Sequence, residues 1–272
     1  MIYILFSTAV ALTALISVNT AWNSTLQAVV CILAIFAAVF IVVNIIMALL
    51  ACLLSFFVKK APVEKQNAMA KFWCRAIAKL LCVYFGVKAE FEGFDKIGEK
   101  NFLWVSNHRS GFDPLIIMGL KSELNISFIS KPSNFNFKPI GFMAEGIGCL
   151  TIDRENNREA LKTILTASDY IKKGICSIGI YPEGHRSKTG ELLPFHNGSF
   201  KIAEKAKCPV VVAATSGSEN IMKNFPLRKT EVKISVLEVI DTERVTEMKT
   251  AEMSPYVRSM IGDYLEGKSE NE

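Results

Sequence analysis

The chain of 272 residues is 50% hydrophobic, which is too apolar for an average soluble protein, and its formal net charge is +5. Residues 1–58 contain no Asp, Glu, Lys or Arg, so all 31 basic and 26 acidic residues lie from Lys59 onward. This division excludes a uniformly soluble chain, and it leaves a charged part that is long enough for one globular domain with a full core.

Two apolar runs, residues 1–18 and 28–58, occupy the uncharged part. A membrane-spanning helix needs roughly 20 apolar residues, so the second run is long enough to span a bilayer and the first is marginal. A cleaved signal peptide is the alternative for the first run, but it lacks a positively charged n-region. We therefore expect residues 1–58 to form a transmembrane helical hairpin. Lys59 and Lys60 follow directly, so the positive-inside rule predicts an integral membrane protein whose charged domain lies on the cytoplasmic face.

The seven cysteines lack a CxxC pair or any spacing typical of a metal site. Five of them lie in the charged part, where a cytoplasmic location would keep them reduced. We expect free thiols and no metal ion.

Residues 59–88 carry apolar side chains at helical spacing, with Lys71, Arg75 and Lys79 between them. A basic amphipathic helix with aromatic residues on its apolar face suits a bilayer interface. A plain core helix would give the same periodicity. Because an apolar run and a Lys-rich flank precede this segment, we expect an interfacial helix that holds the rest of the chain close to lipid.

Residues 89–266 alternate apolar runs of strand length with helical patterns. The predicted strands, which are short and rich in β-prone residues, are 87–94, 102–106, 126–130, 149–152, 175–181, 209–215 and 232–239. The predicted helices are 112–120, 155–173, 199–205 and 252–265. This alternation predicts an α/β domain with a mostly parallel mixed sheet flanked by helices, followed by a frayed tail over 267–272. There is no nucleotide-binding glycine fingerprint, and we expect no nucleic-acid partner.

A histidine and an aspartate follow the strand predicted at 102–106, with His108 and Asp113 five residues apart. A loop that leaves a strand and turns into a helix can bring the Asp side chain back beside the imidazole, which gives a general base with an orienting partner. A chance pairing with a solvated His is equally compatible with this stretch alone.

Two other predicted strands also end in polar groups, namely Arg154 after 149–152 and Glu183, Gly184 and Arg186 after 175–181. The carboxyl ends of parallel strands line a common crevice, so we expect these groups to face one pocket. Two guanidinium groups can bind a phosphate bidentately, and Gly184 lets backbone N–H groups approach it. Each Arg taken singly is more often a surface residue.

Four sequence blocks together resemble the membrane-bound glycerolipid acyltransferase family, typified by 1-acylglycerol-3-phosphate acyltransferase. They are Asn-His-x-x-x-x-Asp at 107–113, a Gly followed by Ile-Asp-Arg at 148–154, Pro-Glu-Gly-x-Arg-Ser at 182–187, and a Pro-Val-rich strand at 208–212. Two positions depart from the family pattern. His185 stands where Thr is usual, and His196 stands where a Phe-Lys-x-Gly-x-Phe element has its Lys.

The resemblance implies an O-acyltransferase of phospholipid biosynthesis that needs no cofactor. Its donor would be acyl-CoA or acyl-carrier protein, and its acceptor a lysophospholipid from the membrane, 1-acylglycerol 3-phosphate above all. His108 would be the general base and Asp113 its orienting partner. The residues implied in holding the glycerol phosphate are Arg154, Glu183, Gly184 and Arg186, with Lys131 as a further candidate for the phosphate or the oxyanion.

Several alternatives stay open on the sequence alone. Ser110 could form an acyl-enzyme, although no Gly-x-Ser-x-Gly elbow surrounds it. The acceptor could be another lysolipid or glycerol 3-phosphate. A lipid or thioester hydrolase could use the same His/Asp pair, and a non-catalytic membrane scaffold could share the fold.

Overall fold

The computed structural model describes residues 10, 13, 25–58, 68–136, 141, 144–153, 156–187 and 190–267. The chain divides into two units, Met1–Phe57 and Val58–Glu272. In the first unit, helix α2 (Thr25–Val58) is free of charged residues. Its exposed side chains include the apolar Val30, Leu33 and Ile41.

The hairpin predicted for residues 1–58 is not supported by the structure. The second apolar run is helical as α2, whereas the first run lies almost wholly outside the described residues. Within the described part of the chain, no helix has both the length and the apolarity required to cross a membrane.

The second unit is built on a seven-stranded sheet with the order β1-β7-β6-β2-β5-β3-β4. Its strands are β1 (Val87–Glu92), β2 (Leu103–Ser106), β3 (Ile126–Ser130), β4 (Leu150–Thr151), β5 (Ser177–Ile180), β6 (Val210–Ser216) and β7 (Thr230–Ile240). All neighbouring strands are parallel except β6 and β7. The predicted α/β class with a mostly parallel mixed sheet is therefore confirmed. β2 lies at the centre, and all four of its residues are buried.

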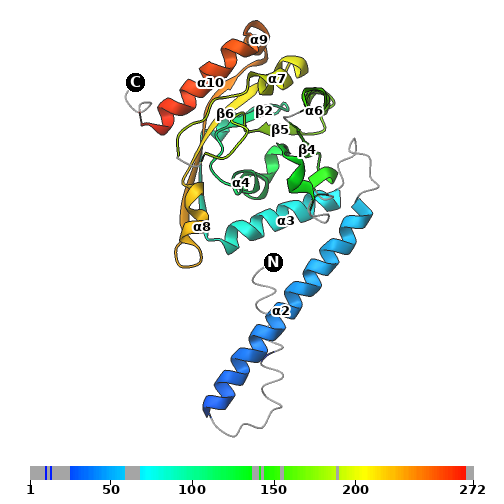
Figure 1. The fold of residues 1–272 in the computed structure, drawn as a ribbon, viewed down its shortest axis with the longest axis vertical. Helices are drawn as coiled ribbons and strands as arrows, with labels where there is room; N and C mark the ends of the chain where they lie inside the picture. The colour runs from blue at the N-terminus through cyan, green and yellow to red at the C-terminus, as the bar shows by residue number, and fades with distance from the viewer. Residues whose placement is uncertain are drawn as a thin grey trace. The chain divides into compact units, whose positions relative to one another are not determined.

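Helices cover both faces of this sheet (Figure 1). One face carries α3 (Ala68–Tyr84) and α4 (Asp113–Leu120), and the other carries α6 (Asn157–Lys172), α7 (Lys201–Ala206) and α10 (Thr250–Leu265). Successive residues of β2 point to opposite faces, so Trp104 joins the cluster with Ile116 of α4, whereas Leu103 joins the cluster with Ile164 of α6.

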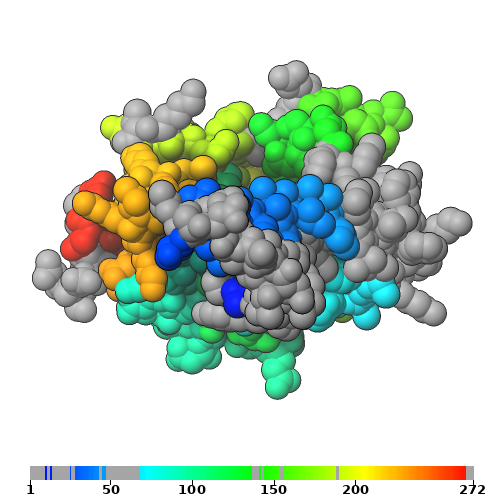
Figure 2. Space-filling model, turned by 90° about the horizontal axis from the view of Figure 1, so that it is seen from below, coloured from blue at the N-terminus to red at the C-terminus, as the bar shows by residue number. Residues whose placement is uncertain are grey.

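The remaining helical segments are short. They are α8 (Ile221–Asn224), α9 (Thr242–Glu247) and the 3₁₀ helices η1 (Phe94–Lys96), η2 (Ser122–Leu124), η3 (Pro132–Phe135), η4 (Asn197–Phe200) and η5 (Ser218–Asn220). Figure 2 shows the gold segment around α8 at the protein surface, and its Met222 and Leu227 are exposed.

Helix α3 occupies part of the segment for which an interfacial helix is expected. It buries Ala70, Ala78 and Cys82 but leaves Phe72 and Tyr84 exposed. The buried face packs on α4, where a Cβ at Gly119 would lie only 2.6 Å from the backbone nitrogen of Lys79. The helix is therefore partly a core helix, and its outer face is apolar at several positions. Residues 59–67, which precede it, lie outside the described residues.

Local capping chemistry determines where two helices begin. The Asn156 side chain accepts hydrogen bonds from the backbone N–H groups of Arg158 and Glu159, so α6 begins at residue 157. Asp241 caps α9 in the same way through the N–H of Arg244. Helix α9 was not among the predicted helices, although an N-cap residue of the preferred type marks its start.

Candidate active site

The His108 imidazole and the Asp113 carboxylate are in direct contact, with 2.8 Å between Nδ1 and Oδ2. Both residues follow β2, His108 in the loop and Asp113 as the first residue of α4. Asp113 Oδ2 also accepts the backbone N–H groups of Arg109 and Ser110, each at 2.8 Å. Because a carboxylate oxygen with these partners is an acceptor, Nδ1 must be the donor. Nε2 is then the ring nitrogen that can accept a proton.

The second oxygen of Asp113 is held from a distant part of the chain. The Ser218 hydroxyl donates to Oδ1 at 2.5 Å, and both groups are buried. Ser218 begins η5, directly after β6, which neighbours β2 in the sheet. The carboxylate therefore has all its partners within the protein, and its orientation is fixed on both sides.

Asn107 ties the same loop to the end of β6. Its Nδ2 donates to the carbonyl oxygen of Thr215 at 2.9 Å, and its Oδ1 accepts the Thr215 N–H at 2.8 Å. The Asn107 side chain is fully buried. It thus replaces the backbone pairing that the sheet can no longer provide once β2 has ended.

An aromatic stack sets the plane of the imidazole. The His108 ring stacks on Tyr181 with 4.2 Å between ring centroids, and Tyr181 stacks in turn on Phe128 at 5.6 Å. Gly179 leaves room for the Phe128 ring, because a Cβ at Gly179 would collide with it. Burial, together with the nearby charge of Asp113, raises the pKa of Tyr181, so this residue is a neutral phenol at physiological pH.

Glu183 contacts the His108 loop, and each of its carboxylate oxygens accepts a hydrogen bond from a backbone N–H group. Oε1 accepts the His108 N–H at 2.6 Å, and Oε2 accepts the Leu193 N–H at 2.9 Å. The residue is only 3% exposed. Burial raises its pKa, although these two hydrogen bonds and the charges of His108 and Arg109 act in the opposite direction. This is the geometry of a positioning residue, and its predicted contact with glycerol phosphate stays a prediction.

The structure brings most of the predicted phosphate-binding residues to the same place. Gly184 has φ of 79°, a left-handed conformation that suits glycine, and it follows Glu183 directly. Arg186 is exposed, and its Nη1 lies 3.8 Å from the position of a Cβ on Gly111, within the His108–Asp113 loop. Its guanidinium group therefore lies beside the loop that carries the candidate base, on the surface of the protein.

The described structure does not place the other two predicted residues in this group. Arg154 lies outside the described residues. Lys131 is exposed after β3, which is separated from β2 by β5 in the sheet. The sequence analysis did not single out Arg109, whose guanidinium donates a hydrogen bond to the Gly190 carbonyl and so fastens the loop after His108 to the segment after Arg186.

A cavity of about 460 Å³ opens beside this group at the carboxyl ends of β3 and β5. Its apolar wall is formed by Ile129, Ile152, Leu161, Ile164 and Ile180. Its polar wall contains Gly184, His196, Asn197, Ser199 and Lys201.

The two histidines that depart from the family pattern are both exposed. His196 lines the cavity, together with a basic residue, Lys201, five positions further on. His185 does not line it, and it lies between Gly184 and Arg186. Across the described ranges, no group of three or more His, Cys, Asp or Glu side chains could hold a metal ion.

Comparisons with known proteins agree with these features. A family model described as Acyltransferase matches residues 88–216. A 1-acyl-sn-glycerol-3-phosphate acyltransferase from Saccharomyces cerevisiae is 25% identical over 207 residues, which is 75% of this chain and 68% of that protein. The protein of the same name from Escherichia coli is 29% identical over 192 residues, covering 66% of this chain and 74% of the relative.

The fold has a solved counterpart as well. The crystal structure of the 1-acyl-sn-glycerophosphate (LPA) acyltransferase PlsC from Thermotoga maritima superimposes with a TM-score of 0.59 and covers 73% of this chain and 79% of that chain at 22% identity. At this identity the likeness concerns the fold alone.

The family model matches residues 88–216, the part of the chain that contains the His108–Asp113 pair and five of the seven strands, so these residues form an acyltransferase domain. This domain and the homologues support an enzyme of the 1-acylglycerol-3-phosphate O-acyltransferase type, in agreement with the resemblance carried by the four sequence blocks.

Proposed function

We propose that the enzyme transfers a fatty acyl group from a thioester donor to the free hydroxyl of 1-acylglycerol 3-phosphate, which yields phosphatidate for phospholipid biosynthesis. The observation that carries this proposal is the imidazole of His108, held by Asp113 with Nε2 left as acceptor. The names of the relatives support the acceptor, since each relative described above is named for acyltransfer to 1-acylglycerol phosphate.

The His108 ring would act as general base. Nε2 takes the proton from the acceptor hydroxyl as its oxygen attacks the thioester carbonyl carbon. The tetrahedral oxyanion then collapses, the carbon–sulfur bond breaks, and the thiolate leaves with the proton from the imidazolium. Asp113 holds the ring in the required tautomer and stabilises its charged form. A base of this kind contributes roughly 10²–10⁴-fold to the rate, so the positioning of the substrates has to supply much of the remainder.

The acceptor phosphate would bind beside Arg186 and the backbone at Gly184, since both lie next to the His108 loop. Arg154 and Lys131 stay predicted contributors. The 460 Å³ cavity supports a lipid substrate, because its apolar wall offers a dry surface to an acyl chain and its polar wall contains His196 and Lys201. Lys201 would supply the positive charge that the family pattern places at position 196.

Direct transfer is favoured over an acyl-enzyme on Ser110. The Ser110 backbone N–H is bound to Asp113, and its hydroxyl accepts the N–H of Phe112 at 3.3 Å. The residue is 8% exposed. A nucleophilic serine would instead need its hydroxyl hydrogen-bonded to the base.

We further propose that the enzyme acts at the cytoplasmic face of a membrane, with acyl-CoA or acyl-carrier protein as donor. A lysolipid acceptor resides in a bilayer, and α3 exposes Met69, Phe72, Val83 and Tyr84 on its outer face. The net charge of +5 would favour contact with anionic lipid or an acidic carrier protein.

The test is an acyl-transfer assay on the detergent-purified full chain. Labelled acyl-CoA and acyl-carrier protein are each offered with lysophosphatidate, other lysophospholipids or glycerol 3-phosphate. We expect labelled phosphatidate as the main product and little free fatty acid without an acceptor. Free fatty acid as the main product would identify a hydrolase, and a preference for glycerol 3-phosphate would replace the proposed acceptor.

A further inference from the structure

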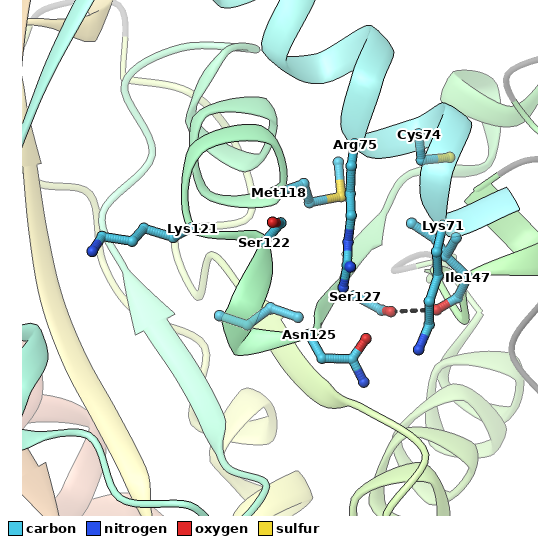
Figure 3. Close-up of a pocket in the computed structure, with 10 residues that line it drawn as sticks. Lys71, Cys74, Arg75, Met118, Lys121, Ser122, Asn125, Ser127 and Ile147 are labelled. Carbon is cyan, nitrogen blue, oxygen red and sulfur yellow. Dashed lines mark hydrogen bonds between the residues drawn. The ribbon is translucent and has the colours of Figure 1, made fainter. Parts of the chain in front are cut away.

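A second cavity lies at the amino end of β3, whereas His108 follows the carboxyl end of β2. It is small and lies between α3 and the segment that leads into β3, and its lining includes Lys71, Arg75, Ser122, Asn125 and Ser127 (Figure 3). β3 and β2 both run parallel to β5, so the amino end of β3 faces away from the carboxyl ends that carry the catalytic loop. A ligand in this cavity would not reach the reacting atoms.

The cavity is lined by positive charge without a compensating acid. Lys71 and Arg75 are one helical turn apart on α3, and Figure 3 shows both side chains extending toward Asn125 and Ser127. No Asp or Glu is among the described residues that line it. The nearest acid in the sequence, Glu123, pairs instead with Lys121 at 3.6 Å.

Lys121 also lines this cavity, but its ammonium group is not directed into it. Its ammonium group lies 5.0 Å from the centre of the Phe91 ring and 4.8 Å from that of Phe94. In Figure 3 its side chain extends away from Lys71 and Arg75. The cationic groups directed into the cavity are therefore those of α3.

The opposing wall is rigid because its polar side chains are already bonded to backbone. The Ser127 hydroxyl donates to the Ile147 carbonyl at 2.6 Å, and Asn125 Nδ2 donates to the Ile175 carbonyl at 3.0 Å. This wall fixes the shape of the cavity, and the charged donors that face it are Lys71 and Arg75. Burial, followed by the charge of Arg75, lowers the pKa of Lys71, so an anion placed between the two cations would stabilise both.

We propose that this cavity is a phosphate-binding site, separate from the catalytic site, in which Arg75 and Lys71 hold the phosphate oxygens. The planar guanidinium group suits two oxygens of one phosphate, and the lysine adds a point charge from one turn earlier on the same helix. The ligand is a free phosphate or the phosphate monoester of a lipid headgroup, which have this chemistry in common.

The experiment uses the detergent-purified full chain carrying Arg186→Ala, which removes the arginine proposed for the catalytic site. Calorimetric titration with sodium phosphate at constant ionic strength tests the free anion. Co-sedimentation with phosphatidylcholine vesicles, with and without phosphatidate, tests the headgroup. We expect Lys71→Gln to weaken phosphate-dependent binding by about tenfold or more, because it removes a charged hydrogen-bond donor. Arg75→Lys, which keeps the charge, should weaken it less than Arg75→Gln.

Lys79→Gln is the matched control, because Lys79 is exposed on the same helix, does not line the cavity and undergoes the same change of charge. A loss specific to Lys71→Gln in the titration identifies free phosphate as a ligand. The same loss confined to phosphatidate vesicles identifies the lipid headgroup. Equal losses in Lys71→Gln and Lys79→Gln, or no loss in either assay, would overturn the proposal. These experiments measure binding and not acyl transfer, so they can fail while the proposed function holds, and the reverse.

Discussion

The hydrogen bonds around Asp113 explain how a single histidine can be held ready for proton transfer. Four donors meet one buried carboxylate, and three of them come from residues 108–110, next to one another in the chain. The fourth, Ser218, comes from a loop more than a hundred residues away. His108 is therefore oriented by a residue five positions away, whereas Asp113 is also held by a residue from a distant part of the chain.

Substitution of the candidate base, His108, and of the candidate nucleophile, Ser110, distinguishes direct transfer from an acyl-enzyme. We expect His108→Ala to lower kcat by roughly 10²–10⁴-fold, since it removes the general base. Ser110→Ala should retain substantial activity, because direct transfer needs no acyl-serine. Steady-state rates of phosphatidate formation provide the measurement, and mass-spectrometric detection of an acyl group on Ser110 would contradict this expectation.

Substitution of Ser218 tests whether a residue that bonds to Asp113, and not to the substrate, positions the catalytic pair. Ser218→Ala removes a hydrogen bond to a charged group, which is worth about 1.5–3 kcal/mol, so we expect kcat to fall by about tenfold or more while KM changes little. Ser218→Thr keeps the hydroxyl and should restore most of the rate. A drop confined to KM, or equal activity in the Ala and Thr variants, would show that the hydroxyl does not act through Asp113.

Glu183 provides a prediction about stability and pH. Its pKa is raised in the folded state, so the stability that its neutral form contributes is present below about pH 4.5 and is lost as the pH rises through the folded-state pKa. We expect Glu183→Gln to remove this dependence. The variant should also cost about 1–3 kcal/mol of unfolding free energy at pH 7, because the amide NH₂ must then face a backbone N–H.

Denaturant unfolding of Glu183→Gln at pH 4 to 7 measures both effects. Glu204→Gln is the control, since Glu204 is exposed on α7 and undergoes the same chemical change. Equal stability of the two variants at pH 7 would exclude a positioning role for the Glu183 carboxylate.

The contact between helices α3 and α4 depends on a single glycine. Because a Cβ at Gly119 would lie 2.6 Å from the Lys79 nitrogen and 2.9 Å from the Ala78 carbonyl carbon, Gly119→Ala must push α3 and α4 apart. We expect a loss of about 1–3 kcal/mol of unfolding free energy. Gly98→Ala is the matched control, because nothing lies within 4 Å of a Cβ at that position. Chemical denaturation compares the two, and equal stabilities would contradict the tight contact.

Elements whose sequence signal is local were predictable. β2, β3, β5 and β6 are apolar almost throughout, which predicts buried strands from the sequence alone. Helix α6 is preceded by Asn156 and followed by Gly174, residue types that favour the start and the end of a helix. The β7 strand was also found, but its antiparallel pairing with β6 was not, because register and direction are decided by the partner strand.

The parts of the candidate site that escaped prediction all depend on long-range contacts. The residue types in Asn107 to Asp113 indicated a base and a carboxylate, and the structure has them 2.8 Å apart. Nothing near Ser218 or Tyr181 in the sequence indicates that one meets Asp113 and the other stacks on His108. Glu183 was assigned to the substrate from its motif, whereas its backbone partners appear only in three dimensions.

At the scale of the whole α/β unit, buried thiols couple stability to alkaline pH. Burial raises the pKa of Cys82 to about 11 and of Cys149 and Cys208 to about 12, from an ordinary value of 9.0. Their contribution to stability is therefore complete below about pH 9 and is lost as the pH rises toward these folded-state values.

We expect the unfolding free energy to fall between pH 9 and 11, and Cys149→Ala to reduce the slope by up to about 1.4 kcal/mol per pH unit. Denaturant unfolding across this range gives the slope. Cys31→Ala, which changes a thiol of α2 outside this unit, should leave the slope as it is. An unchanged slope in Cys149→Ala would contradict the role assigned to burial.

The tie between Asn107 and Thr215 also has a consequence for the order in which the protein matures. During synthesis, residues 107–113 emerge long before β6, so the histidine and its aspartate exist at first on a loop without its distant restraints. The centre of the sheet is complete only when β6 has paired with β2, and β7 then adds to the other side of β6. We therefore expect nascent chains that stop before Thr215 to be inactive even though every motif residue up to Arg186 is present. Acyl transfer should begin only when the second half of the sheet has closed on the first.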